Sequence, residues 1–476
     1  MPAFPRRRPI GSARPTAVCG NLPPDNARAA VLRFDRPRPK RSPCVYRVND
    51  ARRQRDQLIR SYVDSETGLV DELRSGGVGG LATVAARLGV ASRRTDVAGY
   101  GRSRSYRDSE LIALFEALER YGGTAPGGRR TSVAAPYADV ADRAIDPRSL
   151  GLYPPERYEL PGFPFHRFDP GRPISWVWGY SLQQCAPVLV PELIAYYGAA
   201  GSLPGETALV YECSNGCALG GCLEEAIFHA ILEIAERDAF LLTWHARRIV
   251  PRLDLATAAD PAVPLLAATI TRQTGYRVVV FETTVEHGIP CTWALASHPD
   301  DDPGVAKLAC TGGSALDPSR AALNALTELG PILAQLANRY PRNRERAVMM
   351  TENPSAVRQM DEHSLLYACP EVRHRLDFLW AGDTTPFRAP DSDFLHADLR
   401  EDMQALIHRY LDSGLDVIIV DQTTPEHRSE SLHCVKAIVP GTLPMTFGHD
   451  YRRLDGLPRL SRLLTGAIND QPHPFR

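Results

Sequence analysis

Two short charged phrases with one spacing are the residues of this chain best suited to chemistry. The pattern E-x-x-E-R stands at residues 116–120 and again at residues 233–237. In a helix, positions i, i+3 and i+4 share one face, so each copy presents two carboxylates and a guanidinium together. Both copies lie in apolar runs, where a charge is unfavourable unless it is paired or binds metal. Two such faces in one cavity would offer four carboxylates, enough to hold Mg²⁺ against a polyphosphate.

The sequence around the second copy favours a site over a solvated salt bridge, which is the common alternative for neighbouring Glu and Arg residues. A polar, Gly-rich turn at residues 213–222 leads into a helix that we expect to begin near Leu223. Glu225 and Glu236 are eleven residues apart. That spacing is close to three helical turns and lines one stripe about 16 Å long. The helix N-terminus and the glycines before it are suited to bind an anion.

These residues resemble the YcaO family, the ATP-using cyclodehydratases of thiazole/oxazole-modified peptide biosynthesis. The family pattern is approximately S-N-G-x-A-x-G-x-x-x-E-E-A followed by E-x-x-E-R-D-A. The resemblance extends from about Val63 to the last residue and includes segments at residues 101–121, 312–328 and 435–441. The matching residues of the central pattern are Ser214, Asn215, Gly216, Ala218, Gly220, Glu224, Glu225, Ala226, Glu233, Glu236, Arg237, Asp238 and Ala239.

The resemblance implies an α/β (α+β) fold of the YcaO type, in which mixed sheets and helices are duplicated around an ATP cleft. It also implies ATP and Mg²⁺ as cofactors. The carboxylates that it assigns to the metal ions and the nucleotide are Glu116, Glu119, Glu225, Glu233 and Glu236. Arginines suit phosphates and carboxylates alike. The other residues that it assigns to the nucleotide are Arg102, Arg120, Asn215 and Arg237.

The chain departs from the family pattern at the edges of this site. Arg102 and Ser103 stand where the family lead-in has the second and third residues of G-K-G, and Ile112 replaces a usual serine. Gly221 stands where Asn or Thr is frequent. Residues 330–332 read Gly-Pro-Ile where the family often has Gln and then Arg. A non-catalytic, ATP-binding scaffold subunit of a peptide-modifying complex therefore stays open beside an enzyme.

The chain finishes with alternating prolines in a tail at residues 469–476, a composition that favours an extended, stiff backbone. In the family, a proline-rich end that reaches the active site is typical of azoline-forming members. This tail fits, except that its last residue is Arg476 instead of Pro. The terminal carboxylate of Arg476 or the side chain of His473 could accept the nucleophile's proton, with His449 as an alternative. A frayed terminus is the competing interpretation.

Composition separates a basic leader from the rest of the chain. At 476 residues and 43% hydrophobic content the chain can bury a large core, and its net charge of −1 gives no argument for nucleic acid or membrane partners. Residues 1–60 hold fourteen Arg and one Lys against four Asp, so we expect them to be largely disordered, before a catalytic domain at 61–476. The basic start lacks the apolar core of a signal peptide, which predicts a cytoplasmic protein.

The ten cysteines are scattered, which indicates reduced thiols, and the spacing of the three within residues 213–222 does not fit a zinc site. Elsewhere the chain alternates between α and β patterns. Residues 129–204, rich in Pro, Gly and aromatics, are expected to wrap the core as strands and loops. Strands are predicted at 276–282, 416–421 and 432–439, and long helices at 318–338 and 398–413.

The family chemistry implies a peptide substrate. A Cys, Ser or Thr side chain of a ribosomal precursor peptide attacks the preceding backbone carbonyl, the oxyanion is phosphorylated by ATP, and loss of phosphate leaves a thiazoline or oxazoline. The first 60 residues are too short and too basic for a leader-binding domain. We therefore expect a separate leader-peptide-binding partner, ubiquitin-activating-enzyme-like or ocin-ThiF-like, and leave a homodimer open. Thioamide or amidine formation is the alternative within the family.

Overall fold

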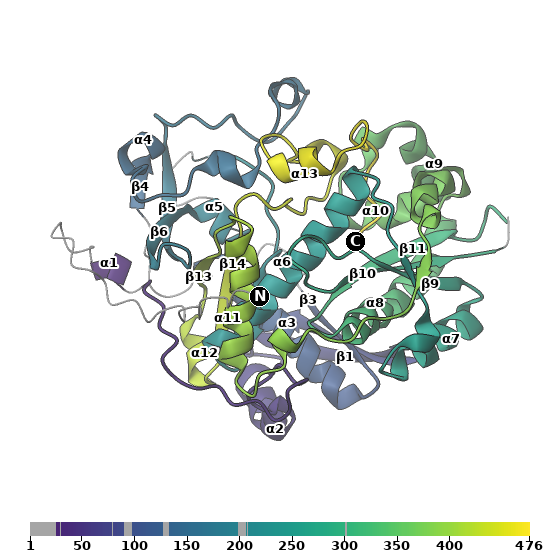
Figure 1. Ribbon diagram of the computed structural model, residues 1–476, viewed down its shortest axis with the longest axis horizontal. Coiled ribbons are helices and arrows are strands. Elements are labelled where there is room, and N and C mark those ends of the chain that lie inside the picture. The colour runs from purple at the N-terminus through teal and green to yellow at the C-terminus, as the bar shows by residue number, and fades with distance from the viewer. Residues whose placement is uncertain are drawn as a thin grey trace, which may run out of the picture.

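The computed structural model is a mixed α/β structure, as the sequence predicts, with sheets and helices packed around one central helix (Figure 1). It describes residues 25–28, 30–78, 80–89, 98–126, 133–198, 206, 208–299 and 302–476. In these ranges no helix is both long and apolar enough to cross a membrane. The nine cysteines among the described residues are all free.

The first sheet positions the first charged phrase. Its antiparallel strands are β1 (Val70–Val78), β2 (Leu81–Leu88) and β3 (Ala98–Ser103). Helix α3 (Tyr106–Thr124) packs on β3, and a side chain at Gly101 would collide with the α3 backbone. The missing Cβ therefore lets α3 lie directly on the strand that precedes it.

The second sheet has the strand order β11-β10-β9-β8-β12 and carries α8 on one face. Asp317 caps the start of α8 by accepting a hydrogen bond from the Ser319 backbone N–H, and α8 continues through Pro331. The predicted strand 276–282 and helix 318–338 are confirmed. The elements are β8 (Arg252–Leu253), β9 (Arg277–Glu282), β10 (Cys291–Ser297), β11 (Leu308–Ser314), β12 (Thr384–Thr385), α7 (Ala262–Thr274) and α8 (Pro318–Arg339).

The third sheet has the order β4-β5-β13-β14-β7, with β6 paired to β5. It confirms the predicted strands at 416–421 and 432–439 and the strands expected within 129–204. Its strands are β4 (Val133–Pro136), β5 (Pro173–Ser181), β6 (Ala186–Pro191), β7 (Cys217–Gly220), β13 (Ile418–Asp421) and β14 (His433–Ile438).

Helix α6 (Leu223–His245) runs between the second and third sheets and contacts β7, β14, β10 and β11 (Figure 1). It begins at Leu223, as predicted, and most of its residues are buried. The remaining helices cover the outside; α11 confirms the helix predicted at 398–413. They are α1 (Asp25–Arg28), α2 (Ala51–Tyr62), α4 (Tyr137–Val140), α5 (Glu192–Ala195), α9 (Arg344–Glu352), α10 (Met360–Tyr367), α11 (Leu399–Asp412), α12 (Pro425–Ser429) and α13 (Pro458–Leu463).

Residues 30–50, which we call the N-terminal strap, differ from the predicted disorder. Phe34 is buried, Lys40 forms a fully buried ion pair with Asp402, and the ring of Tyr46 stacks on Phe228 at 5.0 Å. Composition misses this order because partners far along the chain, not local apolar residues, hold the strap. The same prediction for residues 1–24 lies outside the described residues.

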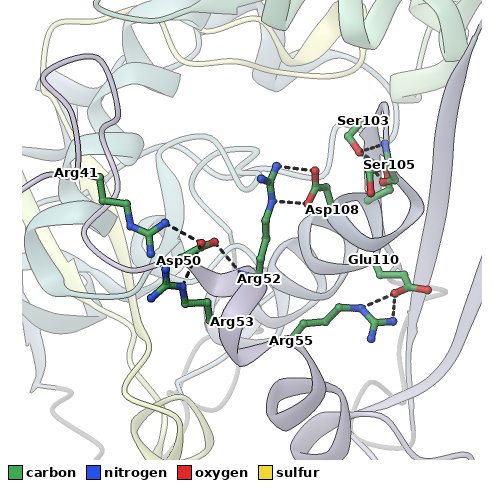
Figure 2. Close-up of polar contacts among 10 residues, drawn as sticks. Arg41, Asp50, Arg52, Arg53, Arg55, Ser103, Ser105, Asp108 and Glu110 are labelled. Carbon is green, nitrogen blue, oxygen red and sulfur yellow. Dashed lines mark hydrogen bonds and ion pairs between the residues drawn. The ribbon is translucent and has the colours of Figure 1, made fainter.

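Helix α2 follows the strap and is bound to α3 by ion pairs (Figure 2). Arg52 donates from Nε and Nη2 to the two carboxylate oxygens of Asp108, at 2.6 and 2.7 Å. Arg55 donates from Nε to Glu110 at 2.9 Å. The strap and α2 are therefore tied to the helix that carries the first charged phrase.

Candidate active site

The first charged phrase lies on α3 and faces inward. Glu116 accepts a hydrogen bond from the Tyr100 backbone N–H at 2.8 Å and pairs with Arg120 at 2.5 Å. Glu119 lies one turn away, and burial, with the charges of Glu233 and Glu116, raises its pKa well above the usual range. Glu119 therefore faces the second phrase, on α6.

The second phrase holds two carboxylates around one guanidinium. Arg237 Nη2 lies 3.6 Å from Glu233, and its Nε lies 3.7 Å from Glu236, both beyond hydrogen-bond distance. Burial raises the pKa of Glu233, against the opposing charge of Arg237. Burial also raises the pKa of Glu236 to about 7, with Glu328 and Glu233 adding to the effect and Arg237 opposing it. The two carboxylates thus share Arg237, and Lys436 adds positive charge only at Glu233.

Glu328, on α8, belongs to this group although the sequence analysis did not assign it a role. Its Oε1 lies 3.4 Å from Nη1 of Arg102 on β3, which places the predicted Arg102 at the same site. The signal was present, since Glu328 closes the 312–328 segment of the resemblance. We define the carboxylate group as Glu116, Glu119, Glu233, Glu236 and Glu328.

The carboxylate group suits Mg²⁺ and a polyphosphate. Among the described residues, no group of three or more His, Cys, Asp or Glu side chains is arranged to hold a metal ion by itself. Mg²⁺ does not require such a group, because it is usually held by one or two carboxylates, waters and substrate phosphates. Two polar atoms at the site, Asn215 Oδ1 and Arg237 Nε, are buried without a hydrogen-bond partner in the described chain. Such orphaned atoms fit a ligand that supplies the missing partners.

Glu225, which the sequence analysis assigns to the metal and the nucleotide, lies outside the carboxylate group as defined here and is paired with the N-terminal strap. Its Oε1 accepts from Arg47 at 2.6 Å and its Oε2 from the Val48 backbone N–H at 3.2 Å. The neighbouring Glu224 accepts from Arg38 at 2.8 Å. Both carboxylates therefore bind the N-terminal strap, and a ligand at Glu225 would have to displace Arg47.

The tail at residues 469–476 is packed into the core, so the frayed interpretation is wrong. The Pro472 carbonyl accepts from the Tyr367 hydroxyl at 2.6 Å, and the Gln471 carbonyl accepts from Trp244 Nε1 at 3.0 Å. Phe475 is 1% exposed, and its ring lies 4.2 Å from the guanidinium carbon of Arg237. The tail therefore reaches the second charged phrase.

Gly312 on β11 allows the tail to lie close to the second charged phrase. A Cβ at this position would lie 2.9 Å from Glu236 Cγ and 3.0 Å from the Phe475 ring. Only a residue without a side chain leaves room for both groups.

His473 does not match its predicted role as a proton acceptor. It is 1% exposed, and its ring stacks on that of His363 with 4.1 Å between the ring centres. Its Nε2 lies 2.9 Å from the Thr446 carbonyl oxygen. Because that oxygen can only accept, Nε2 must carry a proton. Burial and His363 lower the pKa of His473 well below the usual range. The alternative, His449, is also buried, and burial with Arg452 lowers its pKa to about 2. Their burial and lowered pKa values make both histidines poor proton acceptors in this structure.

The side chain of Arg476 is bound to Gln335 on α8. Burial lowers the pKa of Arg476, and the charges that act on it include those of Asp361, Arg339 and Arg102. The Arg476 guanidinium therefore lies near enough to Arg102, the partner of Glu328, for their charges to interact.

The arrangement defines an α/β protein whose acidic, magnesium-compatible site is formed between helices that carry paired glutamates. The chain belongs to the YcaO cyclodehydratase family. The sequence model of the family described as YcaO cyclodehydratase, ATP- and Mg²⁺-binding, matches residues 100–443 of this chain. ATP and Mg²⁺ are therefore the cofactors of its family, as the sequence predicts.

Two relatives in sequence carry no assigned function. An uncharacterized protein of Methanothermobacter thermautotrophicus is 28% identical over 353 residues, which cover 72% of this chain and 80% of the relative. An uncharacterized protein in the tfuA 3′ region of Rhizobium leguminosarum bv. trifolii is 26% identical over 278 residues, which cover 57% of this chain and 61% of the relative.

Solved structures share the fold. A heterocyclase in complex with substrate and cofactor has a TM-score of 0.73 and 24% identity, covering 94% of this chain. This chain spans 60% of that heterocyclase. YcaO from Methanopyrus kandleri bound with AMPPCP and Mg²⁺ has a TM-score of 0.58 and 19% identity, covering 86% of this chain and 95% of the other. At these identities the likeness concerns the fold alone.

Proposed function

We propose that this chain is an ATP- and Mg²⁺-dependent cyclodehydratase that activates backbone amides of a ribosomal precursor peptide. Cys, Ser or Thr side chains of the peptide then cyclise to thiazolines or oxazolines. The observation that carries the proposal is the carboxylate group, in which Glu119, Glu233 and Glu236 have raised pKa values and little compensating positive charge. A divalent cation would place positive charge beside these carboxylates and could at the same time bind the phosphates of a nucleotide.

Each part of the site has a distinct task under this proposal. Bound Mg²⁺ and ATP would supply the phosphoryl group that turns the peptide oxyanion into a leaving group. Glu233 and Glu236 would hold the metal, and Asn215 would supply a polar partner to the nucleotide. Arg237, held between Phe475 and the carboxylates, would keep a fixed guanidinium beside the phosphates.

The proton of the attacking nucleophile needs an acceptor, and the histidines of the tail region are unsuited to this task. We retain the terminal carboxylate of Arg476 as the proposed base, because the Arg476 guanidinium lies near enough to Arg102 for their charges to interact. The proposed assembly includes the precursor peptide and a separate leader-binding protein.

Peptide mass after incubation with ATP, Mg²⁺, partner and precursor tests the proposal. Loss of one water per modified residue is the expected result. Exchange of oxygen for sulfur would instead assign thioamide formation, and ATP binding without turnover in the complete mixture would assign a scaffold subunit. A Glu236→Gln variant in parallel shows whether any activity originates from this chain.

A further inference from the structure

A second, unassigned cavity of about 50 Å³ lies beside the second charged phrase. Its polar lining comes from Glu212, Asn215, Lys436 on β14, and Arg453. Ile234, the residue after Glu233, forms part of its apolar wall. Asn215 and α6 therefore separate this cavity from the carboxylate group.

The cavity carries a net positive charge. Lys436 Nζ lies 3.2 Å from Glu212 Oε1, and Arg453 Nη2 lies 3.3 Å from Glu212 Oε2. The side chains of Lys436 and Arg453 are 3% and 1% exposed. Two buried cations share the only carboxylate among the residues that line the cavity, so the lining has one positive charge in excess. Burying an uncompensated charge is unfavourable, and an anion in the cavity would remove that penalty.

Unused donors face the same cavity. Arg453 Nε is buried without a hydrogen-bond partner in the described chain. Lys436 donates to Glu212 and to the Cys213 carbonyl at 2.9 Å, and an ammonium group has a third N–H. Convergent N–H donors with net positive charge are the chemistry of an anion site.

We propose that this cavity binds a small inorganic oxyanion of the size of phosphate. A single water requires roughly 10–15 Å³ on this measure of volume, so the cavity has room for about three to five waters or one tetrahedral oxyanion. The bound anion would accept from Lys436 and Arg453. Retention of product phosphate here is a corollary that rests on the proposed cyclodehydratase function.

Calorimetric titration of the full chain with inorganic phosphate tests this site. Saturating AMPPCP and Mg²⁺ block the nucleotide site, so the remaining heat reports the cavity. We expect one binding event, with sulfate competing, and a loss of affinity of at least about tenfold in Lys436→Gln, since one charge-assisted hydrogen bond contributes about 1.5 kcal/mol or more.

A second variant keeps the test independent of folding defects. Thr442 lines the cavity and is only partly buried. Thr442→Glu places a negative charge at the cavity and should abolish phosphate binding, whereas Thr442→Gln, the matched neutral control, should bind within about twofold of the wild type. No phosphate binding by the wild-type chain, or unchanged binding in Lys436→Gln and Thr442→Glu, would overturn the proposal. Phosphate binding without peptide modification would leave this site standing and reject the proposed function instead.

Discussion

Helix α6 carries two pairs of glutamates that are chemically alike but differ in how closely cations pair with them. Glu224 and Glu225, at the start of the helix, each accept from their own strap arginine, at 2.8 and 2.6 Å. Glu233 and Glu236, further along, share Arg237 at 3.6 and 3.7 Å. The first pair is neutralised within the protein, whereas the second is left with excess negative charge.

Residue type and spacing along the helix therefore do not decide whether a glutamate is available to a ligand. What decides is whether a cation within hydrogen-bond distance already satisfies it. By this criterion the second pair is available to Mg²⁺ and the first pair anchors the strap.

The largest effect is expected for Glu236→Gln. The substitution keeps the shape of the side chain but removes a ligand charge, so ATP turnover should fall by about a thousandfold or more, because metal coordination stabilises transition states by several kcal/mol. Stability without nucleotide should stay equal or rise, since a poorly compensated buried charge is removed. Steady-state ATP hydrolysis and urea unfolding measure the two effects.

Glu224→Gln is the matched control on the same helix. It should retain turnover within a few-fold and lower the free energy of unfolding by about 1–2 kcal/mol, because Arg38 loses its carboxylate partner. Equal loss of turnover in both variants would contradict the division of α6 into an anchoring pair and a ligand pair.

Truncation after Gln471 is expected to have the next largest effect. It removes Phe475 from the Arg237 guanidinium and leaves Glu233 and Glu236 in place. Peptide modification should fall by about 10- to 100-fold, the range of a lost positioning or acid–base group, with a smaller change in ATP affinity. The milder Phe475→Leu should weaken nucleotide binding by several-fold, since a cation–π contact contributes about 1–2 kcal/mol. Normal peptide modification by both variants would contradict the hypothesis that the tail is part of the active site.

A pH effect separates Glu236 from the paired glutamates. Because the pKa of Glu236 is raised to about 7, its stabilising contribution is complete below its usual pKa and is lost as pH rises through 7. The chain without nucleotide should therefore lose stability relative to Glu236→Gln as pH rises from about 4.5 to about 7, with little further change above pH 8. Mg²⁺–nucleotide affinity should change oppositely, falling below pH 7 as a proton competes with the metal. Parallel pH profiles in the two proteins would contradict this assignment.

The smallest effect is expected at the strap. Arg47 is 49% exposed but its partner Glu225 is only 3% exposed, so Arg47→Gln should lower the free energy of unfolding by about 1 kcal/mol, with part of the difference lost at high salt. Urea unfolding at two ionic strengths measures it. If the same variant instead changes ATP affinity strongly, Arg47 and Glu225 act at the nucleotide and the anchoring role is wrong.

The sequence was most informative where structure depends on neighbours along the chain. Helix α8 begins after the Asp317 cap and α11 after the Asp398 cap, and the apolar pattern of 277–282 forms β9. The two E-x-x-E-R phrases likewise determine which side chains share a helix face. Whether those faces meet was implied by the resemblance alone.

The sequence was least informative where distant residues satisfy each other. Arg38 and Glu224 are 186 residues apart, and Lys40 and Asp402 are 362 apart. No local pattern distinguishes Glu225, which is paired with the strap, from Glu236, which is not. The burial of His473 could not be seen in the sequence for the same reason, because its partners His363 and Thr446 come from elsewhere in the chain.

The buried tail also bears on how the protein folds. Gln471 contacts Trp244 across 227 residues, Pro474 contacts Cys310 across 164, and His473 contacts His363 across 110. Loop-closure entropy must be overcome before such contacts contribute, so we expect them to form late in folding. Until the tail docks, Phe240 lacks the Phe475 ring that packs 4.7 Å from it. Completion of the aromatic core and completion of the site beside Arg237 are therefore a single late event in folding.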